Sequence, residues 1–428
     1  MTQPLPVTGP AAERLLRADY TILVTDQNLT VLGDPIHDWS SLQATLRWKE
    51  PGSGQIVVPA HRYIREQLVP GCRIVVLRRV LGRQQILLAG PMEQYLRERA
   101  DDGQNGGVGV MTVSFADDLA WLAARLAYPD PTKLPKNQTT DYWTYTGNPE
   151  AGMLQLVNTQ AGPAALAARR VPKLQVAPFS GLSGTGTVAL GPTSDVAPRE
   201  RLERLTDVLR RMCTLGVGTG HADSLGFRIR QTHDANGADI LLFEPVRARN
   251  LAGEVHFSFS MGNLKYFSYQ MNAPTLTHSI VGGQGEGADR YIDEFPTTDP
   301  AQLAWGRWDG YVARPGTSPV AELRSAATEA LTEAGQSGRL ASNAADTVDQ
   351  RFAVHYGVGD LVSLELDVSE IITAPVQTVN LQAWPAAGEV VGTTIGDQAS
   401  RYESAWIREM RQMDLRVGRL ERTALAVV

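Results

Sequence analysis

The sequence has few of the residue patterns that carry catalysis or bind metals. Its two cysteines, Cys72 and Cys213, lie far apart without a CxxC or Cys/His pairing, which favours reduced, buried thiols over a disulfide. The seven histidines show no metal-ligand spacing, and His256 falls on the polar face of an expected strand, where a solvent or interface contact is favoured. HExxH, GxxxxGK[ST], GxSxG and EF-hand motifs are all absent. We therefore expect no enzyme, with no catalytic, metal or cofactor-binding residues and no cofactor.

Long apolar runs and a basic, apolar N-terminal signal are also lacking. Runs such as residues 74–77 are far shorter than the roughly 18 residues that span a bilayer. The formal net charge of −6 argues against a phosphate-binding surface spread over the whole chain, although an acidic duct would let DNA slide without gripping it. We expect a soluble chain, made in a cytoplasm, without a membrane anchor.

The composition is that of a folded, turn-rich protein. Hydrophobic residues make up 43% and charged residues 20%, both near globular averages. A length of 428 residues predicts roughly three domains. The 40 glycines and 25 prolines favour many short strands over long helical layers.

The first 130 residues predict a run of antiparallel strands closed by one short helix. The connection at residues 81–83 has the length of a tight hairpin loop. The helix begins near Ala116, with Leu119, Leu122 and Leu126 on one face. The expected strands cover residues 20–25, 29–32, 42–48, 55–58, 73–80, 85–95 and 108–115.

Residues 131–250 predict an intervening α/β domain. A helical pattern over 153–170 is interrupted by Gly162-Pro163, and an amphipathic helix over 199–213 follows an extended, Gly/Ser/Pro-rich loop at 179–198. The apolar stripe of that second helix contains Leu202, Leu205, Leu209 and Met212. The expected strands cover residues 225–230 and 240–243.

Residues 251–397 again predict a strand-rich segment with one helix, like the first 130 residues. A helix after Ser318-Pro319, with Leu323, Ala327 and Leu331 inside, separates the expected strands. These strands cover residues 255–261, 275–281, 352–356, 361–366 and 376–383. The expected fold class is therefore mainly β with accessory helices (α+β), with domains at 1–130, 131–250 and 251–397 and a helix at 398–428.

The last helix carries a short heptad seam. Its apolar residues are spaced by 4, 3, 4 and 3 positions, and they are Trp406, Met410, Met413, Val417 and Leu420. The seam covers about two heptads and has Gly418 inside, so an isolated coiled coil would be marginal. Packing on its own barrel and self-association both stay open.

Two other patterns permit a ligand. The glycine clusters at 216–220 and 282–287 are better explained as flexible loops than as nucleotide-binding turns, because neither opens an amphipathic helix. Asp289, Asp293 and Glu294 lie near Trp305 and Trp308 in sequence, so a glycoside hydrolase or a glycan-binding surface is an alternative. A second aromatic group of the same kind consists of Tyr142, Trp143 and Tyr145.

Several segments in a fixed order carry a family resemblance. They are GQIVVPAHRYIREQLVPGCRIVVLRR (54–79), ILLAGPMEQYL (86–96), VMTVSFADDLAWLAARLAYP (110–129), THSIVGGQGEGADRY (277–291), AVHYGVGDLVSLEL (353–366) and VNLQAW (379–384). Together they resemble the tail-hub (baseplate hub) proteins of siphophages, particularly minor tail proteins of phages that infect actinobacteria. Residues 170–198 match nothing in this pattern.

The resemblance implies a homotrimer at the tail tip, in which each subunit contributes two tube-like antiparallel β-barrels. Such a hub closes the tail tube, anchors receptor-binding and other tip components, and opens for DNA ejection after assembly in the host cytoplasm. Its implied partners are the distal tail protein, the tape-measure protein and, in transit only, DNA. The alternatives are a tail-associated glycan-binding module, a peptidoglycan hydrolase, or another ring component such as the distal tail protein.

Overall fold

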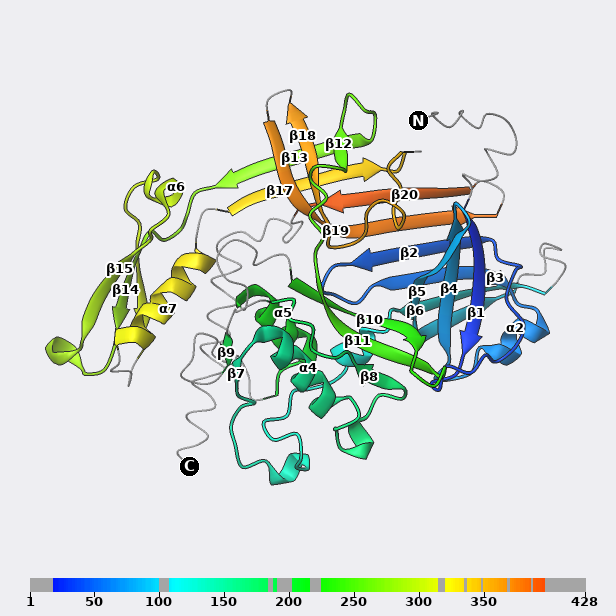
Figure 1. The fold of residues 1–428 in the computed structure, drawn as a ribbon, viewed down its shortest axis with the longest axis horizontal. Helices are drawn as coiled ribbons and strands as arrows, with labels where there is room; N and C mark the ends of the chain where they lie inside the picture. Colours follow the sequence, from blue (N-terminus) through cyan, green and yellow to red (C-terminus); the bar gives the residue numbers. More distant parts are fainter. Residues whose placement is uncertain are drawn as a thin grey trace.

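The structure is a computed structural model that describes residues 18–99, 108–183, 188–190, 202–215, 225–314, 320–334, 337–347, 349–367, 370–385 and 388–396. Most of its regular elements are strands, and the helices are few and short (Figure 1). The predicted class, mainly β with accessory helices, is confirmed. The heptad seam, from Trp406 to Leu420, lies outside the described residues.

The first segment forms strands wherever alternating apolar residues reach the core. The β4–β5 hairpin turns through Leu81 and Gly82, whose φ values are +49° and +76°. The tight hairpin predicted at residues 81–83 is present, and its loop has two residues because Arg83 already pairs with Val80. The strands are β1 (Asp19–Thr25), β2 (Ser41–Arg47), β3 (Ser53–Pro59), β4 (Arg73–Val80), β5 (Arg83–Glu98) and β6 (Val110–Ala116), with helices α2 (Arg62–Gln67) and α3 (Ala120–Ala123). The strand expected at 29–32 is reduced to one antiparallel bridge between Val31 and Thr25 of β1. Asp26 accepts hydrogen bonds from the backbone N–H groups of Asn28 and Thr30, both at 2.8 Å, and so holds a turn there.

The middle segment is a small α/β unit with its own core. It contains β7 (Tyr145–Gly147), α4 (Pro149–Gln160), β8 (Leu174–Val176), β9 (Val188–Leu190), α5 (Leu205–Leu215), β10 (Leu225–His233) and β11 (Asp239–Arg247). Helix α4 starts before the expected residue because Asn148 caps Glu150 and Ala151. Helix α5 starts at Leu205 rather than 199, so Leu202 lies before it and is exposed. The region expected as an extended loop at 179–198 includes β9, which pairs with β7.

The last segment contains more strands than the sequence predicts. They are β12 (His256–Ser258), β13 (Leu264–Asn272), β14 (His278–Gly282), β15 (Ile292–Pro296), β16 (Asp309–Ala313), β17 (Ser337–Ala345), β18 (Leu361–Asp367), β19 (Glu370–Trp384) and β20 (Gly388–Ile395), with helices α6 (Pro300–Leu303) and α7 (Val320–Glu333). The inner face expected for α7 is correct, since Leu323, Ala327 and Leu331 are buried.

Two expected strands of this last segment are corrected. The strand predicted to reach Met261 ends at Ser258, because the Asn263 side chain accepts from the Ser258 N–H group and bends the chain. The strand predicted at 352–356 is a turn, in which Asp346 accepts from the Phe352 N–H group. In both places a polar side chain satisfies backbone groups that a strand would pair.

The first and last segments share one sheet. Its strand order is β1-β4-β5-β6-β3-β2-β19-β20-β17-β13, and β18 pairs with β19 and in turn with β12. The antiparallel pair β2–β19, with Leu46 opposite Val379, joins the two segments (Figure 1). One buried apolar cluster contains residues of both, for example Ile56, Phe115, Phe257 and Ile395. Closure of each segment into a separate barrel stays a prediction.

Two smaller units attach to this sheet. The first is the middle segment, in which α4 and α5 pack on the β10-β11-β8 sheet. The second is an inserted module between β13 and β17, residues 273–336, in which α7 packs on the β15-β14-β16 sheet. Figure 1 shows this module at the left end of the view, beyond the β13–β17 pair.

Candidate functional site

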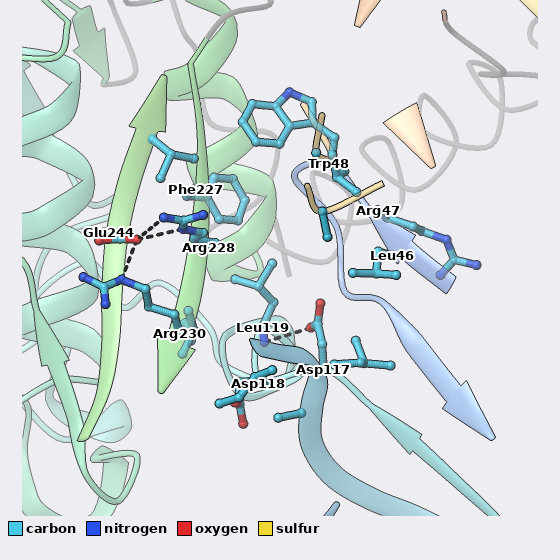
Figure 2. A pocket seen from close by; sticks show the side chains of 18 of the residues that line it. Leu46, Arg47, Trp48, Asp117, Asp118, Leu119, Phe227, Arg228, Arg230 and Glu244 are labelled. Carbon is cyan, nitrogen blue, oxygen red and sulfur yellow. Dashed lines mark hydrogen bonds and ion pairs between the residues drawn. The ribbon is translucent and has the colours of Figure 1, made fainter. Parts of the chain in front are cut away.

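A cavity of about 810 Å³ lies where three parts of the chain meet. Its walls come from the end of β2 and the start of α3, from β10 and β11, and from residues 352–360 of the last segment. Figure 2 shows Trp48, Asp117 and Phe227 from two of these parts around one space. The site is therefore a junction between segments that are distant in sequence.

Trp48 lies between two glycines that belong to different segments. A Cβ atom on Gly226 would come within 2.3 Å of the indole, and one on Gly359 within 2.4 Å. Gly359 also has a φ of +92°, which favours glycine. The Trp48 backbone N–H group donates to the carbonyl of Gln377 at 2.9 Å. A single side chain thus holds β2 against the middle and last segments.

Arg73 forms a buried ion pair within the first segment and a hydrogen bond to the middle one. Arg73 on β4 donates through Nε and Nη2 to the carboxylate of Asp118, at 2.8 and 2.5 Å, and both side chains are almost fully buried. Its Nη1 atom donates to Oε1 of Gln231 on β10 at 2.8 Å. Burial raises the pKa of Asp118, and the two hydrogen bonds and the charge of Arg73 oppose this rise. Because the geometry is bidentate, the pair fixes orientation as well as distance.

Asp117 is the neighbouring buried carboxyl. Its Oδ2 atom accepts from the Gly52 N–H group at 2.8 Å and its Oδ1 atom from the Leu119 N–H group at 2.9 Å (Figure 2). Burial raises the pKa of Asp117 to about 7, the two N–H groups lower it, and the charge of Asp118 raises it further. The carboxyl group therefore changes charge near neutral pH while it ties the β2–β3 turn to the start of α3.

Other charged groups at the cavity form ion pairs. Glu244 on β11 accepts from Arg228 at 2.7 Å and from Arg230 at 2.9 Å (Figure 2). Arg249 forms a two-bond pair with Asp360, at 3.0 and 2.5 Å. Among the residues that the structure describes, no group of three or more His, Cys, Asp or Glu side chains is placed to hold a metal ion. The arrangement joins segments that are distant in sequence.

A second buried network joins β4 to β20. Arg78 donates to the carboxylate of Glu389 through Nε at 2.9 Å and Nη2 at 2.6 Å, and through Nη1 to the carbonyl of Phe352 at 2.9 Å. The Tyr20 hydroxyl also donates to Glu389. Burial alone would lower the pKa of Arg78, but the hydrogen bonds and charge of Glu389 raise it above its ordinary value.

The same network extends into the turn at 346–356. The Tyr356 hydroxyl donates to Asp346 at 2.6 Å and lies 2.8 Å from the Thr393 hydroxyl on β20. Burial raises the pKa of Asp346, although the hydrogen bonds that it accepts from the Tyr356 hydroxyl and the Phe352 N–H group oppose the rise. Buried polar contacts therefore stabilise the shared sheet at β4 and β20, in addition to strand pairing.

The predicted ligand residues lie outside this junction. Trp305 and Trp308 are exposed in the turn that precedes β16 of the inserted module. The structure brings Glu294 near them, because Arg307 bonds both Glu294, at 3.1 Å, and Asp309, at 2.8 Å. A glycan contact by these residues stays a prediction.

The other predicted positions have structural contacts. Asp293 accepts from the Tyr291 hydroxyl at 3.2 Å, and Asp289 lies in a short 3-10 turn. Trp143 and Tyr145 stack with ring centroids 5.9 Å apart and pack against the core of the middle segment. The glycine cluster at 282–287 forms the turn after β14, and the cluster at 216–220 lies outside the described residues.

Sequence reasoning missed the junction residues because their partners are non-local. Asp118 lies at the start of an expected helix and Arg73 lies within an expected strand. The two residues are 45 positions apart in sequence. The only local signal was the placing of charged residues at otherwise apolar strand positions, as with Arg73 and Arg78 within β4. No described helix is long and apolar enough to cross a bilayer.

The comparisons with known proteins point to phage tails. The family described as Siphovirus ReqiPepy6 Gp37-like protein matches residues 21–397. No curated protein matches the chain. A tail protein from Neisseria meningitidis MC58 has a similar structure, with a TM-score of 0.49 and 13% identity over 89% of this chain and 97% of that one.

Two further solved structures are similar at the same level. The 43 kDa tail protein of prophage MuSo2 from Shewanella oneidensis has a TM-score of 0.48 and 10% identity, over 88% of this chain and 98% of that one. Prophage tail protein gp18 from Listeria monocytogenes EGD-e also has a TM-score of 0.48 and 10% identity, over 92% and 99%. Because each TM-score is below 0.5, the family assignment rests on the family match alone.

Proposed function

Because the chain belongs to the Siphovirus ReqiPepy6 Gp37-like family of siphovirus tail proteins, we propose that it is the structural hub at the tip of a long phage tail. In this role it closes the tail tube, anchors receptor-binding and other tip components, and opens for DNA ejection. It acts mechanically, without catalytic residues or a cofactor, as a component of the virion tail that is assembled in the host cytoplasm.

The observation that carries this proposal is the shared sheet. The strand order runs without interruption from β1 to β13 and joins segments more than 300 residues apart through β2–β19. Buried ion pairs at Arg73–Asp118 and Arg78–Glu389 brace it at two places. A part that must hold its neighbours under load needs such a rigid body, because buried, bidentate contacts resist relative motion of the segments.

The proposed assembly is a homotrimer. Each subunit contributes one tube-like unit from 1–130 and one from 251–397, so three subunits present six similar units to a sixfold tail tube. The partners are the distal tail protein, the tape-measure protein and receptor-binding parts, and DNA only passes through. The seam formed by Trp406, Met410, Met413, Val417 and Leu420 is one route to self-association.

The mass of the purified full-length chain in solution tests the proposal. Native mass spectrometry should give three copies. Six copies would favour the distal tail protein instead, and a monomer at micromolar concentration would count against any ring.

The enzyme alternative has its own test. A peptidoglycan hydrolase would clear host cell wall in a zymogram, and Asp289→Ala or Glu294→Ala would abolish the clearing. We expect no clearing by the wild-type chain.

A further inference from the structure

The inserted module, residues 273–336, has no part in the main core. Its own small core consists of Val281, Leu323 and Ala327, with Phe295 and Val312 packed against them. The chain leaves the shared sheet through β13 and returns through β17, and Asn272 lies opposite Ser337 where the module begins and ends. The module is therefore carried on a two-stranded arm, as Figure 1 shows.

One turn of this module presents large apolar side chains to solvent. Leu303, Trp305 and Trp308 are 43%, 42% and 49% exposed, within six positions of one another. We name residues 303–309 the tryptophan turn. Two exposed indoles in one short turn form a candidate binding surface.

The tryptophan turn is held rigidly. The buried Thr277 hydroxyl donates to the carbonyl of Gly306 at 2.9 Å and accepts from the Trp308 N–H group at 2.8 Å. The Trp308 carbonyl accepts from the N–H groups of Thr277 and His278, at 2.8 and 3.0 Å. The indole Nε1–H group of Trp308 donates to the carbonyl of Trp305 at 3.1 Å. The backbone of the turn and the Trp308 ring are therefore held in place before a ligand binds, which favours affinity.

Charged groups border the two rings. Arg307, between them in sequence, is held by Glu294 and Asp309. Charged residues are depleted at the centre of protein–protein interfaces, so this mixture of rings and ion pairs does not fit a dry protein contact. The apolar area is also small, on the order of 300 Å² for three half-exposed side chains, whereas a stable protein interface takes about 800 Å² from each partner.

The charge of the module limits the ligand further. Nine acidic and four basic residues lie between 273 and 336, so this stretch carries −5 of the formal −6 of the whole chain. An anionic polymer would be repelled. The C–H faces of an uncharged pyranose pack on indole rings, and its hydroxyl groups bond planar charged side chains such as those of Arg307, Glu294 and Asp309.

We propose that the tryptophan turn binds a neutral polysaccharide of pyranose units, and that Trp305 and Trp308 are the stacking residues. Arg307 and its two carboxylates are the hydrogen-bonding groups. The site is independent of the hub role, because it lies on the module and not on the shared sheet.

An array of immobilised oligosaccharides, probed with the full-length chain, tests this proposal. The array should carry neutral hexose and N-acetylhexosamine oligomers, and uronic-acid and sialylated oligomers as the anionic set. We expect binding to members of the neutral set. Trp308→Ala should reduce it at least 10-fold, and Trp308→Phe, which keeps an aromatic face, should reduce it less. Tyr266→Ala on β13 is the matched control, since Tyr266 is 57% exposed but outside the module, and it should leave binding unchanged.

Three results would overturn the proposal. The first is that no neutral oligomer binds the wild-type chain more strongly than it binds the Trp305→Ala/Trp308→Ala double variant. The second is a preference for the anionic set. The third is an equal loss of binding in Tyr266→Ala. If the chain recovers another tail protein in a Trp308-dependent way and gives no glycan signal, the turn is a protein-docking site instead. The trimer mass is not expected to change in any of these variants, so failure here leaves the hub proposal standing.

Discussion

Substitution of Glu389 by glutamine tests whether the buried pair on β4 and β20 braces the shared sheet. Arg78 is fully buried, and Glu389 is almost so. The substitution removes the negative charge and leaves the guanidinium with the Phe352 carbonyl and one amide oxygen. It also places an amide N–H group against an arginine N–H group. Loss of one partner from a buried pair costs about 3–5 kcal/mol, because the other charge stays buried and uncompensated.

This cost is measurable by urea unfolding, followed by far-UV circular dichroism. With a denaturant slope of about 3 kcal/mol per molar, the midpoint should fall by about 1 to 1.7 M. The double variant Arg78→Met/Glu389→Leu removes both charges and should recover a large part of the loss, since well-packed apolar residues often replace a buried pair at little cost.

The matched control is Glu66→Gln, which removes the exposed pair between Arg62 and Glu66. Exposed pairs contribute at most about 1 kcal/mol, so this variant should unfold close to the wild type. If Glu389→Gln also unfolds within about 1 kcal/mol of the wild type, the pair is not a brace and the argument for a rigid sheet is weakened.

Three further predictions address the junction and the heptad seam predicted from Trp406 to Leu420. Since burial raises the pKa of Asp117 to about 7, its stabilising contribution is fully present below about pH 4 and is lost as the pH rises through 7, so the free energy of unfolding should fall over that range. Gly226→Ala should destabilise the chain by about 1–3 kcal/mol, because the new methyl group would overlap the Trp48 indole. Trp406→Ala with Met413→Ala should reduce oligomer mass at low concentration more than it lowers the unfolding midpoint.

Each of these predictions has a control and a contrary outcome. Asp117→Asn should flatten the pH dependence, and an unchanged slope would contradict the role of this carboxyl. Gly253→Ala is the control for the glycine substitution, because a methyl group there meets open space and the backbone has no positive φ. An unchanged oligomer mass in the double variant at low concentration would assign the seam to packing within the chain.

Local patterns predicted those parts of the fold that local contacts determine. The β4–β5 hairpin was predicted from the short connection at residues 81–83, and the inner face of α7 from the spacing of its apolar residues. The strands β13 and β17 were not predicted. The residues of β17, SGRLASNAA, are mostly small or polar, so the sequence resembles a loop. They form a strand because they pair with β13.

The junction could not be predicted, because its geometry depends on packing between distant segments. Nothing near Trp48 in sequence indicates that Gly226 and Gly359 will leave room for its ring. Likewise, nothing in the sequence around Arg73 indicates that it pairs with Asp118. By contrast, the closeness of Trp305 and Trp308 is evident from the sequence, because both lie in one short turn.

The central claim is that three copies of this chain form the hub at the tail tip. A cryo-electron microscopy reconstruction of the virion that contains the chain tests it most directly, since it gives copy number and axial position together. We predict three copies around the tube axis at the distal end of the tail tube, with the strands of 1–130 and 251–397 facing the channel. Six copies in one ring, or a position away from the axis, would contradict the account.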